Sequence, residues 1–567
     1  MKNKWILAPK ISDDFKNQFP EINPIILQLL YNRGLTTQKQ IDEFLMPDYS
    51  QDLHDPFLFS DMDKVIERIN RAIQNKEKIL IYGDYDADGI TASAILKLTL
   101  EKLGAVAIDV YLPDREKEGY GIKKEIIEKF TKENIKLIIT CDCGITANQE
   151  IELANQLGMQ VIVTDHHLPL TNLPPAYAII NQHCEEKYPF KYLAGVGVAF
   201  KVVQALFKKI SIINNQLSNL EAFEKWLLDL VAIGTVADNM PILGENRTLI
   251  KYGLIVLNKT KRIGLRALIK EAAIELGDLD TWNIYYQIAP RINAASRMDH
   301  ANTALSLILT NSQSEAQKIA QELNRLNNQR QKLVEDIFQQ LKNSFGSEPK
   351  EKILIAQGEK WPVGILGLIA NKLTDEYNRP SLVLTIREND IIGSGRSIED
   401  FNLVELFASV NHFLSRFGGH SKAAGLALED KNQISNFVSA LQKVAEEKLR
   451  NFDFSKKIFI EVEIDLKDIN WELEEALEKF EPFGEGNRQP LFLIRNLKIE
   501  NLEWVGQNSQ HLKMVANGRK FIIFCANGKC DNLRLGDKVD VVIEIGVNLW
   551  NGVKEIQMKV IDINFAK

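Results

Sequence analysis

The sequence predicts a multidomain α/β protein whose C-terminal part is all β. Two observations carry this prediction. Short apolar runs typical of buried strands alternate with helical patterns between residues 64 and 164 and again from residue 352, as in parallel sheets covered by helices. From about residue 457 the chain instead shows runs of alternating apolar and polar residues with Asn-Gly turns, a pattern typical of strands joined by hairpins.

Length and composition agree with a globular protein of several domains. The 567 residues suffice for roughly three to five domains, and 45% are hydrophobic and 26% charged. No secretory signal or apolar run of about 18 residues is evident, and five cysteines provide no disulfide framework, so we expect a cytoplasmic protein. The net charge of −7 argues weakly against nucleic-acid binding, although bound divalent cations would invert the sign of an acidic pocket.

The elements of the first α/β region follow in a regular order after a helical segment at residues 1–45. Helices are expected at 65–72, 91–103, 122–130 and 149–157, and strands at 78–83, 106–112, 137–140 and 160–164. From residue 194 to about 310 the pattern is mostly helical. Such alternation predicts a doubly wound parallel sheet with helices on both faces.

Residues 314–341 are predicted to form one long helix. Apolar residues recur there with heptad-like spacing, at Ile319, Leu323, Leu326, Leu333, Ile337 and Leu341. A helix of this span is about 42 Å long. An amphipathic helix packed on one domain would show the same pattern, but we favour a connecting strut between two domains.

A smaller α/β region and the β region complete the chain. The former has predicted strands at 352–356, 380–386 and 391–392 and helices at 363–373 and 403–413. The latter has strands at 458–464, 520–524, 539–545 and 556–561, which fit a small barrel or sandwich.

The stretch LIYGDYDADG, residues 80–89, carries three aspartates at alternate positions. A calcium loop would need a ligating Glu at its twelfth position, but counting from Asp84 that position is Ile95. The acids instead follow a predicted strand. Asp142 follows the third strand, and Asp165, His166 and His167 follow the fourth. Because the carboxyl ends of parallel strands share one edge of a sheet, we expect these clusters to meet in space.

So many carboxylates repel one another unless some are protonated or cations bind. Oxygen ligands with one or two imidazoles suit Mn²⁺ or Mg²⁺. Asp142 could bridge two ions about 3.5–4 Å apart, the spacing used for in-line phosphoryl displacement. Alone, Asp142 would be interpreted as a helix N-cap, but three clusters at three strand ends favour a metal site.

These motifs resemble those of the DHH phosphoesterase superfamily, to which Gly234-Thr-Val-Ala-Asp238 adds a fourth. Residues 290–298, 393–397, 418–420, 423–425 and 482–487 resemble the motifs of its single-strand-specific exonucleases, which act from 5′ ends in bacterial recombination and repair. The resemblance covers nearly the whole chain. It implies a helical segment at 1–45, a DHH catalytic domain at 46–310, a connecting helix at 311–347, a DHHA1 substrate-binding domain at 348–452 and an OB-fold at 453–567. Because OB-folds bind single strands partly by stacking aromatic side chains on bases, the implied OB-fold makes Phe492, Trp504 and Trp550 candidates for stacking.

The resemblance also implies roles for individual residues. The ligands of two ions, Mn²⁺ or Mg²⁺, would be Asp86, Asp88, Asp142, His166 and Asp238, with Asp84 and His167 as catalytic or supporting groups. The DNA contacts would be Arg115, Tyr120, Arg291, Arg297, Ser394, Gly395, Arg396, Gly419 and His420, and the choice between Arg291 and Arg297 stays open. Pro362, Ser296 and Arg488 depart from the usual pattern, which puts fine DNA contacts in doubt but removes no ligand.

The implied function is two-metal hydrolysis of single-stranded DNA in the 5′ to 3′ direction. A monomer is expected, with a helicase and a single-strand-binding protein as possible partners and no membrane association. Two alternatives remain. Smaller DHH proteins cleave short oligoribonucleotides or cyclic dinucleotides, and some relatives are non-catalytic scaffolds that have lost ligands.

Overall fold

The computed structural model describes residues 3–214, 217–388, 390–550 and 552–566. The chain divides into two compact units. An α/β unit comprises Leu53–Met240 and Leu249–Phe454, and a β unit comprises Met1–Asp52, Pro241–Thr248 and Ser455–Lys567. No helix in the described ranges is both long and apolar enough to cross a membrane.

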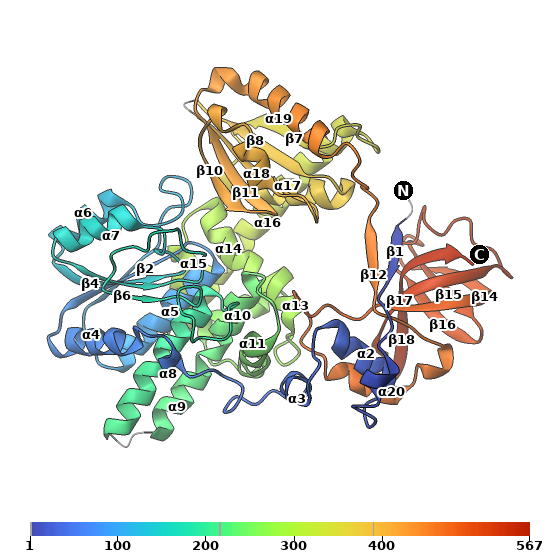
Figure 1. Ribbon diagram of the computed structural model, residues 1–567, viewed down its shortest axis with the longest axis horizontal. Helices are drawn as coiled ribbons and strands as arrows, with labels where there is room; N and C mark the ends of the chain where they lie inside the picture. The colour runs from blue at the N-terminus through green and yellow to red at the C-terminus, as the bar shows by residue number, and fades with distance from the viewer. Residues whose placement is uncertain (1–2, 215–216, 389, 551, 567) are drawn as a thin grey trace. The chain divides into compact units, whose positions relative to one another are not determined.

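The first sheet of the α/β unit is wholly parallel, with strand order β3-β2-β4-β5-β6 (Figure 1). Its strands are β2 (Lys78–Gly83), β3 (Ile108–Tyr111), β4 (Ile135–Cys141), β5 (Gln160–Thr164) and β6 (Ala178–Ile180). Helices α6 (Lys124–Lys132) and α7 (Asn148–Gln156) share an apolar core with one face. Helices α4 (Met62–Gln74), α5 (Ala87–Lys102) and α8 (Gly195–Asn214) pack together on the other. The predicted doubly wound sheet is confirmed, although β6 was not predicted.

A helical layer follows, as the sequence predicts. It consists of α9 (Leu217–Trp226), α10 (Leu228–Ala237), α11 (Gly244–Leu257), α12 (Ile263–Glu271), α13 (Thr281–Asn283), the π-helix η2 (Ile284–Ile288), α14 (Ala289–Met298) and α15 (Asn302–Leu309). Helix α10 packs on α5 and α8, and α14 contacts α5 as well. These contacts bring α10 and α14 to the helices that follow the carboxyl edge of the first sheet.

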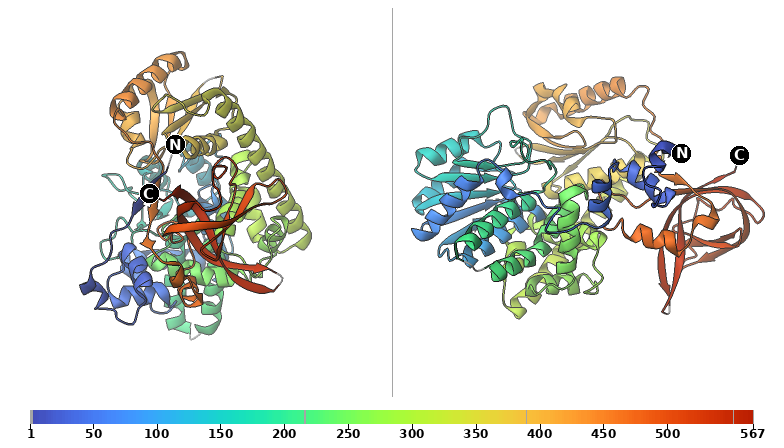
Figure 2. Two further views of the ribbon diagram at one scale, coloured as in Figure 1. Left: turned by 90° about the vertical axis from the view of Figure 1, so that its right-hand side faces the viewer. Right: turned by 60° about the horizontal axis from the view of Figure 1, so that its bottom comes forward.

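The long helix α16 (Gln313–Phe345) joins this layer to the second α/β domain (Figure 2, left). It packs on α12, α14 and α15 and also on α17 (Val363–Tyr377). Val334, Ile337 and Phe338 of its second half share a core with β7 (Leu354–Glu359) and α17. The helix therefore contacts both domains, which confirms the prediction of a connecting strut.

The second sheet is mixed, with strand order β10-β11-β9-β8-β7. β7 and β8 (Ser381–Ile386) are parallel, whereas β9 (Ile391–Arg396), β10 (Leu414–His420) and β11 (Ala423–Leu428) are antiparallel to their neighbours. Helices α18 (Leu403–Ala408) and α19 (Ile434–Lys448) cover it. Strands β10 and β11 were not predicted, because their glycines weaken the apolar pattern.

The β unit is built on a closed barrel. Its strands are β13 (Val462–Glu463), β14 (Phe492–Val505), β15 (His511–Ala516), β16 (Arg519–Ile523), β17 (Lys538–Trp550) and β18 (Val553–Phe565). Their order is β13-β14-β15-β16-β18-β17, and β14 also pairs with β17, which closes the barrel as in an OB-fold. Phe492 is fully buried, so its proposed stacking role is wrong, whereas Trp504 is 39% exposed. The side chain of Trp550 lies outside the described part of the chain.

The N-terminal segment belongs to this same unit. Helices α1 (Asp13–Lys16), α2 (Pro24–Asn32), α3 (Gln38–Leu45) and α20 (Trp471–Glu478) share one apolar core with the barrel. Strand β1 (Lys4–Leu7) pairs in parallel with β12 (Lys457–Ile460). The prediction of a purely helical segment at 1–45 therefore missed this strand, whose partner lies far away in the sequence.

Candidate metal centre

The loop between β2 and α5 gathers three acids by capping a helix. Asp86 is the N-cap of α5, and its Oδ1 accepts hydrogen bonds from the N–H groups of Asp88 and Gly89, at 3.0 and 3.1 Å. A Cβ atom at Gly89 would lie 2.6 Å from the carbonyl oxygen of Asp84. Only glycine therefore allows the turn to close this tightly, and closure brings Asp84, Asp86 and Asp88 to the sheet edge.

Asp88 is held by a second helix. Its carboxylate accepts hydrogen bonds from the N–H groups of Gly195 at 2.6 Å and Val196 at 2.8 Å, at the N-terminus of α8. A helix N-terminus stabilises negative charge, but Asp88 is 1% exposed. Burial and the charge of Asp86 outweigh these hydrogen bonds and raise the pKa of Asp88 to about 7.

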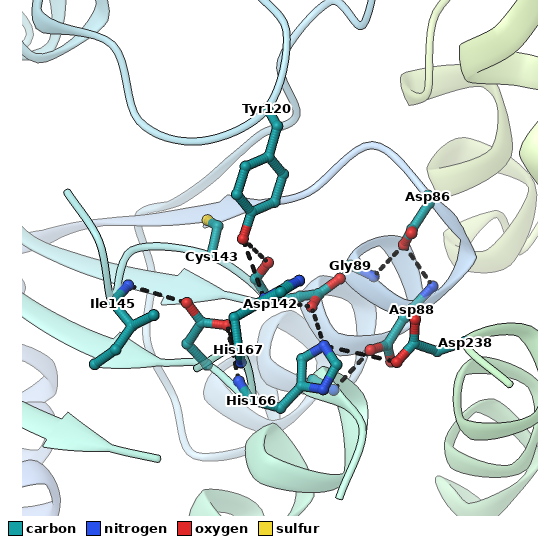
Figure 3. Close-up of polar contacts among 12 residues, drawn as sticks. Asp86, Asp88, Gly89, Tyr120, Asp142, Cys143, Ile145, His166, His167 and Asp238 are labelled. Atoms are coloured by element: carbon teal, nitrogen blue, oxygen red, sulfur yellow. Dashed lines mark hydrogen bonds and ion pairs between the residues drawn. The ribbon is translucent and has the colours of Figure 1, made fainter. Parts of the chain in front are cut away.

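Asp142 follows β4 directly and has a left-handed backbone, with φ of +60°. Its buried Oδ1 atom has no hydrogen-bond partner. The Nε2 atom of His166 nevertheless lies only 3.0 Å from this oxygen, and 3.6 Å from Oδ2 of Asp238 (Figure 3). Electron pairs of all three side chains are thus close together without satisfying one another, as expected of ligands that face a common ion.

His167 is held in place by two neighbours. Its Nδ1 atom lies 2.8 Å from Oδ1 of Asp165 and 3.1 Å from the hydroxyl of Tyr120. Asp165 is fully buried and also accepts the backbone N–H groups of Ile145 and His166. Burial opposes charge on His167, but the hydrogen bond and charge of Asp165 prevail and raise the pKa of His167 above its ordinary value. This residue can therefore keep a proton inside the site.

The remaining groups show the cost of crowding. Burial, followed by the charges of the other carboxylates, raises the pKa of Asp84, Asp142 and Asp238 well above their ordinary value. Burial, followed by the charge of His167, lowers the pKa of His166 to about 3, so its imidazole is neutral and has a free electron pair. Divalent cations would relieve the repulsion and use that electron pair.

Three groups of side chains have ligand atoms within 4.8 Å of one another, namely Asp84–Asp86–Asp142, Asp88–His166–Asp238 and Asp142–His166–His167. Asp142 belongs to two of them. The orphaned Oδ1 atoms of Asp84 and Asp142 supply acceptors with no other use. Oxygen-rich groups with imidazole suit Mn²⁺ or Mg²⁺. The donor set therefore fits two divalent cations with Asp142 between them.

The structure also brings several of the predicted DNA contacts to this centre. Tyr120 donates a hydrogen bond to the carbonyl of Asp142 at 3.3 Å. The guanidinium of Arg115 lies over the ring of Tyr85, 4.7 Å from its centroid. Arg297 donates a hydrogen bond to the carbonyl of Gly364 at 2.5 Å. Burial, followed by the charges of other arginines, lowers the pKa of Arg297, and the charge of Asp86 opposes this.

The second α/β domain holds most of the other residues predicted to contact DNA. Arg396 donates to the carbonyl of Gly395 at 2.8 Å and to Oγ of Ser394 at 3.4 Å. His420 is exposed at the end of β10, close enough for its charge to help lower the pKa of His166. At Gly419, with φ of +132°, a Cβ atom would lie 2.4 Å from the carbonyl oxygen of Ala423. Arg291, by contrast, bonds to the Gln287 carbonyl and to Asn324.

The sequence analysis assigned no role to two groups that shape the site. Asp165 stands inside a quoted motif, yet its function in holding His167 depends on its burial. The Oδ1 atom of Asn293 accepts the N–H of Ala87 at 2.8 Å and so ties α14 to the acidic loop. Asn293 lies in the quoted stretch 290–298, but nothing in the sequence pairs it with a residue 206 positions away.

Comparison with known proteins agrees with this geometry. The model of the DHH family N-terminal domain matches residues 78–235, that of the DHHA1 domain residues 350–447, and that of the RecJ OB domain residues 460–562. The single-stranded-DNA-specific exonuclease RecJ of Bacillus subtilis (strain 168) is 35% identical over 573 residues, which cover 99% of this chain and 71% of the relative. RecJ of Thermus thermophilus is 32% identical over a region that covers 87% of this chain and 70% of the relative.

Solved structures show the same likeness. RecJ of Thermus thermophilus in complex with Mn²⁺ superimposes with a TM-score of 0.85 at 28% identity, covering all of this chain and 80% of that one. The same protein in complex with Mg²⁺ superimposes with a TM-score of 0.79 at 26% identity, covering 100% of this chain and 79% of that one. The two α/β domains and the ligand groups at the sheet edge define a protein of the DHH/DHHA1 class. With a RecJ OB domain as its third part, this chain belongs to the RecJ family.

Proposed function

We propose that this chain is an exonuclease that hydrolyses phosphodiester bonds of single-stranded DNA with two Mn²⁺ or Mg²⁺ ions. The observation that carries the proposal is the position of Asp142, which belongs to two ligand groups at once. The name shared by the curated relatives, single-stranded-DNA-specific exonuclease RecJ, supports the substrate. The Mn²⁺ and Mg²⁺ complexes of the Thermus thermophilus protein support the choice of metals.

The protein's own groups have separable tasks in this mechanism. The ions, when bound, lower the pKa of a water and neutralise charge on the phosphoryl oxygens. Asp86, Asp88, Asp142, His166 and Asp238 hold them, and Asp84 adds a carboxylate on the side of Asp86.

Asp165 holds His167 through Nδ1, which leaves Nε2 for the substrate. Because its pKa is raised, His167 keeps a positive charge or a proton near the developing charge on the phosphate.

The residues that would grip the DNA flank this centre. We assign phosphate contacts to Arg115, Arg297, Ser394, Gly395, Arg396, Gly419 and His420, and a contact to the terminal nucleotide to Tyr120. Between Arg291 and Arg297, we choose Arg297 as the contact nearest the ions, because the charges of Asp86 and Arg396 both influence its pKa. Trp504 of the barrel is exposed and remains a candidate for base stacking.

Several finer assignments rest on the family resemblance. We propose cleavage from the 5′ end, a role in recombination and repair, a cytoplasmic location, a monomeric state and cooperation with a helicase and a single-strand-binding protein. We also propose the domain boundaries at residues 45, 310, 347 and 452. A non-catalytic scaffold is disfavoured because all five predicted ligand positions hold a ligating side chain.

Digestion of single strands labelled at either end tests the proposal. With Mn²⁺ or Mg²⁺, 5′-labelled strands should lose their label as mononucleotides at once, while 3′-labelled strands shorten gradually. Duplex DNA with blunt ends should resist. Equal release from both ends would refute the polarity, preference for oligomers of two to five nucleotides would favour the short-substrate alternative, and no hydrolysis with either metal would refute the enzyme.

A further inference from the structure

The apolar seam of α16 is interrupted by two polar residues, Asn327 and Arg330. The residues that α16 buries recur every three or four positions, at Ala316, Ala320, Leu323, Leu326, Asn327, Val334, Ile337 and Phe338. Position 330 completes this spacing, three residues after Asn327 and four before Val334, yet it is an arginine. Arg330 therefore stands where packing alone would place an apolar side chain.

This position lies at the junction of the two α/β domains. Helix α16 contacts α12, α14 and α15, and its part after Arg330 shares the core of β7 and α17. Helices α14 and α17 also meet here, since Arg297 of α14 donates to the carbonyl of Gly364 in α17. Arg330 thus faces the place where the second domain approaches the metal centre.

The guanidinium of Arg330 has few hydrogen-bond acceptors. Its Nε atom is buried and has no hydrogen-bond partner. Its guanidinium donates only to Oδ1 of Asn327, one turn earlier on the same helix, at 2.9 Å. Arg330 is half-buried, and a cation partly withdrawn from water without a carboxylate or a full set of acceptors costs free energy. Such a residue in an apolar seam indicates a ligand that the protein itself does not supply.

The groups around Arg330 are also cations. Burial, followed by the charges of Arg115 and Arg330, lowers the pKa of Arg297, and burial, followed by the charge of Arg291, lowers the pKa of Arg330. The charge of Arg396 also lowers the pKa of Arg297, whereas the charge of Asp86 raises it. In the described part of the chain, none of these five arginines forms an ion pair, although Glu271 lies near Arg291. Arg325, on the exposed face of the same helix, does pair, with Glu322.

We propose that Arg330 binds a phosphate of the DNA strand, so that the backbone leaves the metal centre past Arg297, crosses the connecting helix at Arg330 and continues to Arg291. This inference rests on the proposed function and extends it. It makes α16 part of the substrate path as well as a strut. It also gives Arg291 a place in that path, farther from the ions than Arg297.

Arg330→Met tests the proposal, because it completes the apolar seam and removes the charge. Its affinity for a fluorescent oligothymidylate of about twenty nucleotides, measured by anisotropy in EDTA, should fall about ten- to a hundredfold, the loss of one charge-assisted hydrogen bond. The slope of log affinity against log salt should become shallower by about 0.7, the value for one phosphate contact to a single strand. Arg330→Lys should keep most of the slope.

Two further measurements separate binding from structure. The melting temperature of Arg330→Met should equal or exceed that of the wild type, since a half-buried unpaired charge has been removed. Hydrolysis of thymidine 5′-p-nitrophenyl phosphate with Mn²⁺, a substrate too short to reach α16, should stay unchanged. Arg325→Met, the matched control on the same helix, should alter neither affinity nor salt slope.

Each outcome of these measurements either supports or overturns the proposal. An unchanged salt slope in Arg330→Met, or a lowered melting temperature together with slower hydrolysis of the small ester, would overturn the proposal and make Arg330 a structural residue. The absence of metal-dependent hydrolysis in the wild type would refute the proposed function instead. The metal-free binding experiment would still report on Arg330 in that case.

Discussion

Replacing Asp142 by asparagine should change stability and activity in opposite directions. The buried Oδ1 of Asp142 has no hydrogen-bond partner, and burial and neighbouring carboxylates raise its pKa well above the ordinary value. A buried acceptor left unsatisfied costs about 1–3 kcal/mol. Because asparagine is neutral and its amide can donate to a neighbouring carboxylate, we expect the metal-free variant to gain about 1–3 kcal/mol in free energy of unfolding.

Activity should fall because Asp142 belongs to two ligand groups. The two ions together supply several kcal/mol of transition-state stabilisation. With about 4 kcal/mol lost, and about 1.4 kcal/mol for each factor of ten, kcat should decrease about 10³-fold. Mn²⁺ at about a hundred times its Kd stabilises the wild type by about 2.7 kcal/mol, and the variant should lose most of this gain.

The assay measures turnover of a long single strand and melting curves with and without MnCl₂. Asp63→Asn, a surface carboxylate paired with Lys209 at 3.2 Å, is the matched control and should behave as the wild type. Turnover within tenfold of the wild type in Asp142→Asn, or undiminished stabilisation by Mn²⁺, would refute the reasoning that one carboxylate serves both ions.

Three more predictions follow from the same contacts. Burial raises the pKa of Asp88 to about 7, so the folded metal-free protein keeps a proton that the unfolded chain loses near pH 4. This carboxyl therefore destabilises the fold increasingly from about pH 4 to 7. Stabilisation by Mn²⁺, measured as the shift in melting temperature, should grow from about pH 5.5 to 7.5, and a flat profile would contradict this. A Cβ at Gly195 would lie 2.6 Å from the Cβ of Asp142, so Gly195→Ala should lower turnover at least about tenfold, whereas Gly197→Ala, which meets only a leucine side chain at 3.2 Å, should be tolerated. Arg247 is 1% exposed and donates to backbone carbonyls at both ends of its unit, with its guanidinium 3.9 Å from a phenylalanine ring centroid; Arg247→Met should lower the free energy of unfolding of the β unit by about 3–5 kcal/mol in urea melts, and a loss below about 1 kcal/mol would show that water replaces it.

Much of the fold could be predicted because its signals are local. Strands β2, β4 and β5 each contain a short apolar run, and the helices between them end at glycines or polar turns. The missed elements lack such signals. β6 has only three residues, β10 and β11 are rich in glycine, and β1 needs a partner, β12, that lies about 450 residues away.

The candidate site could be predicted in part for a related reason. Acids directly after parallel strands must share an edge, so Asp86, Asp142 and His166 were expected to meet before any coordinates were known. The Phe492 error has the opposite cause. An aromatic residue in a strand has the same local pattern whether it faces the core or the solvent, and the barrel places this one in the core.

The sequence by itself therefore determined the order of most strands and helices, the residues able to ligate metal, and the sheet edge at which they gather. Only the tertiary structure decided that Asp88 is held by backbone groups 107 residues away, that Asp142 lies between two ligand groups, and that Arg330 interrupts an apolar seam beside other arginines. The physical reason is that the two kinds of information come from interactions of different sequence range. Backbone preferences and apolar periods act over a few residues, whereas burial, charge repulsion and unsatisfied polar atoms depend on which distant segments are packed together.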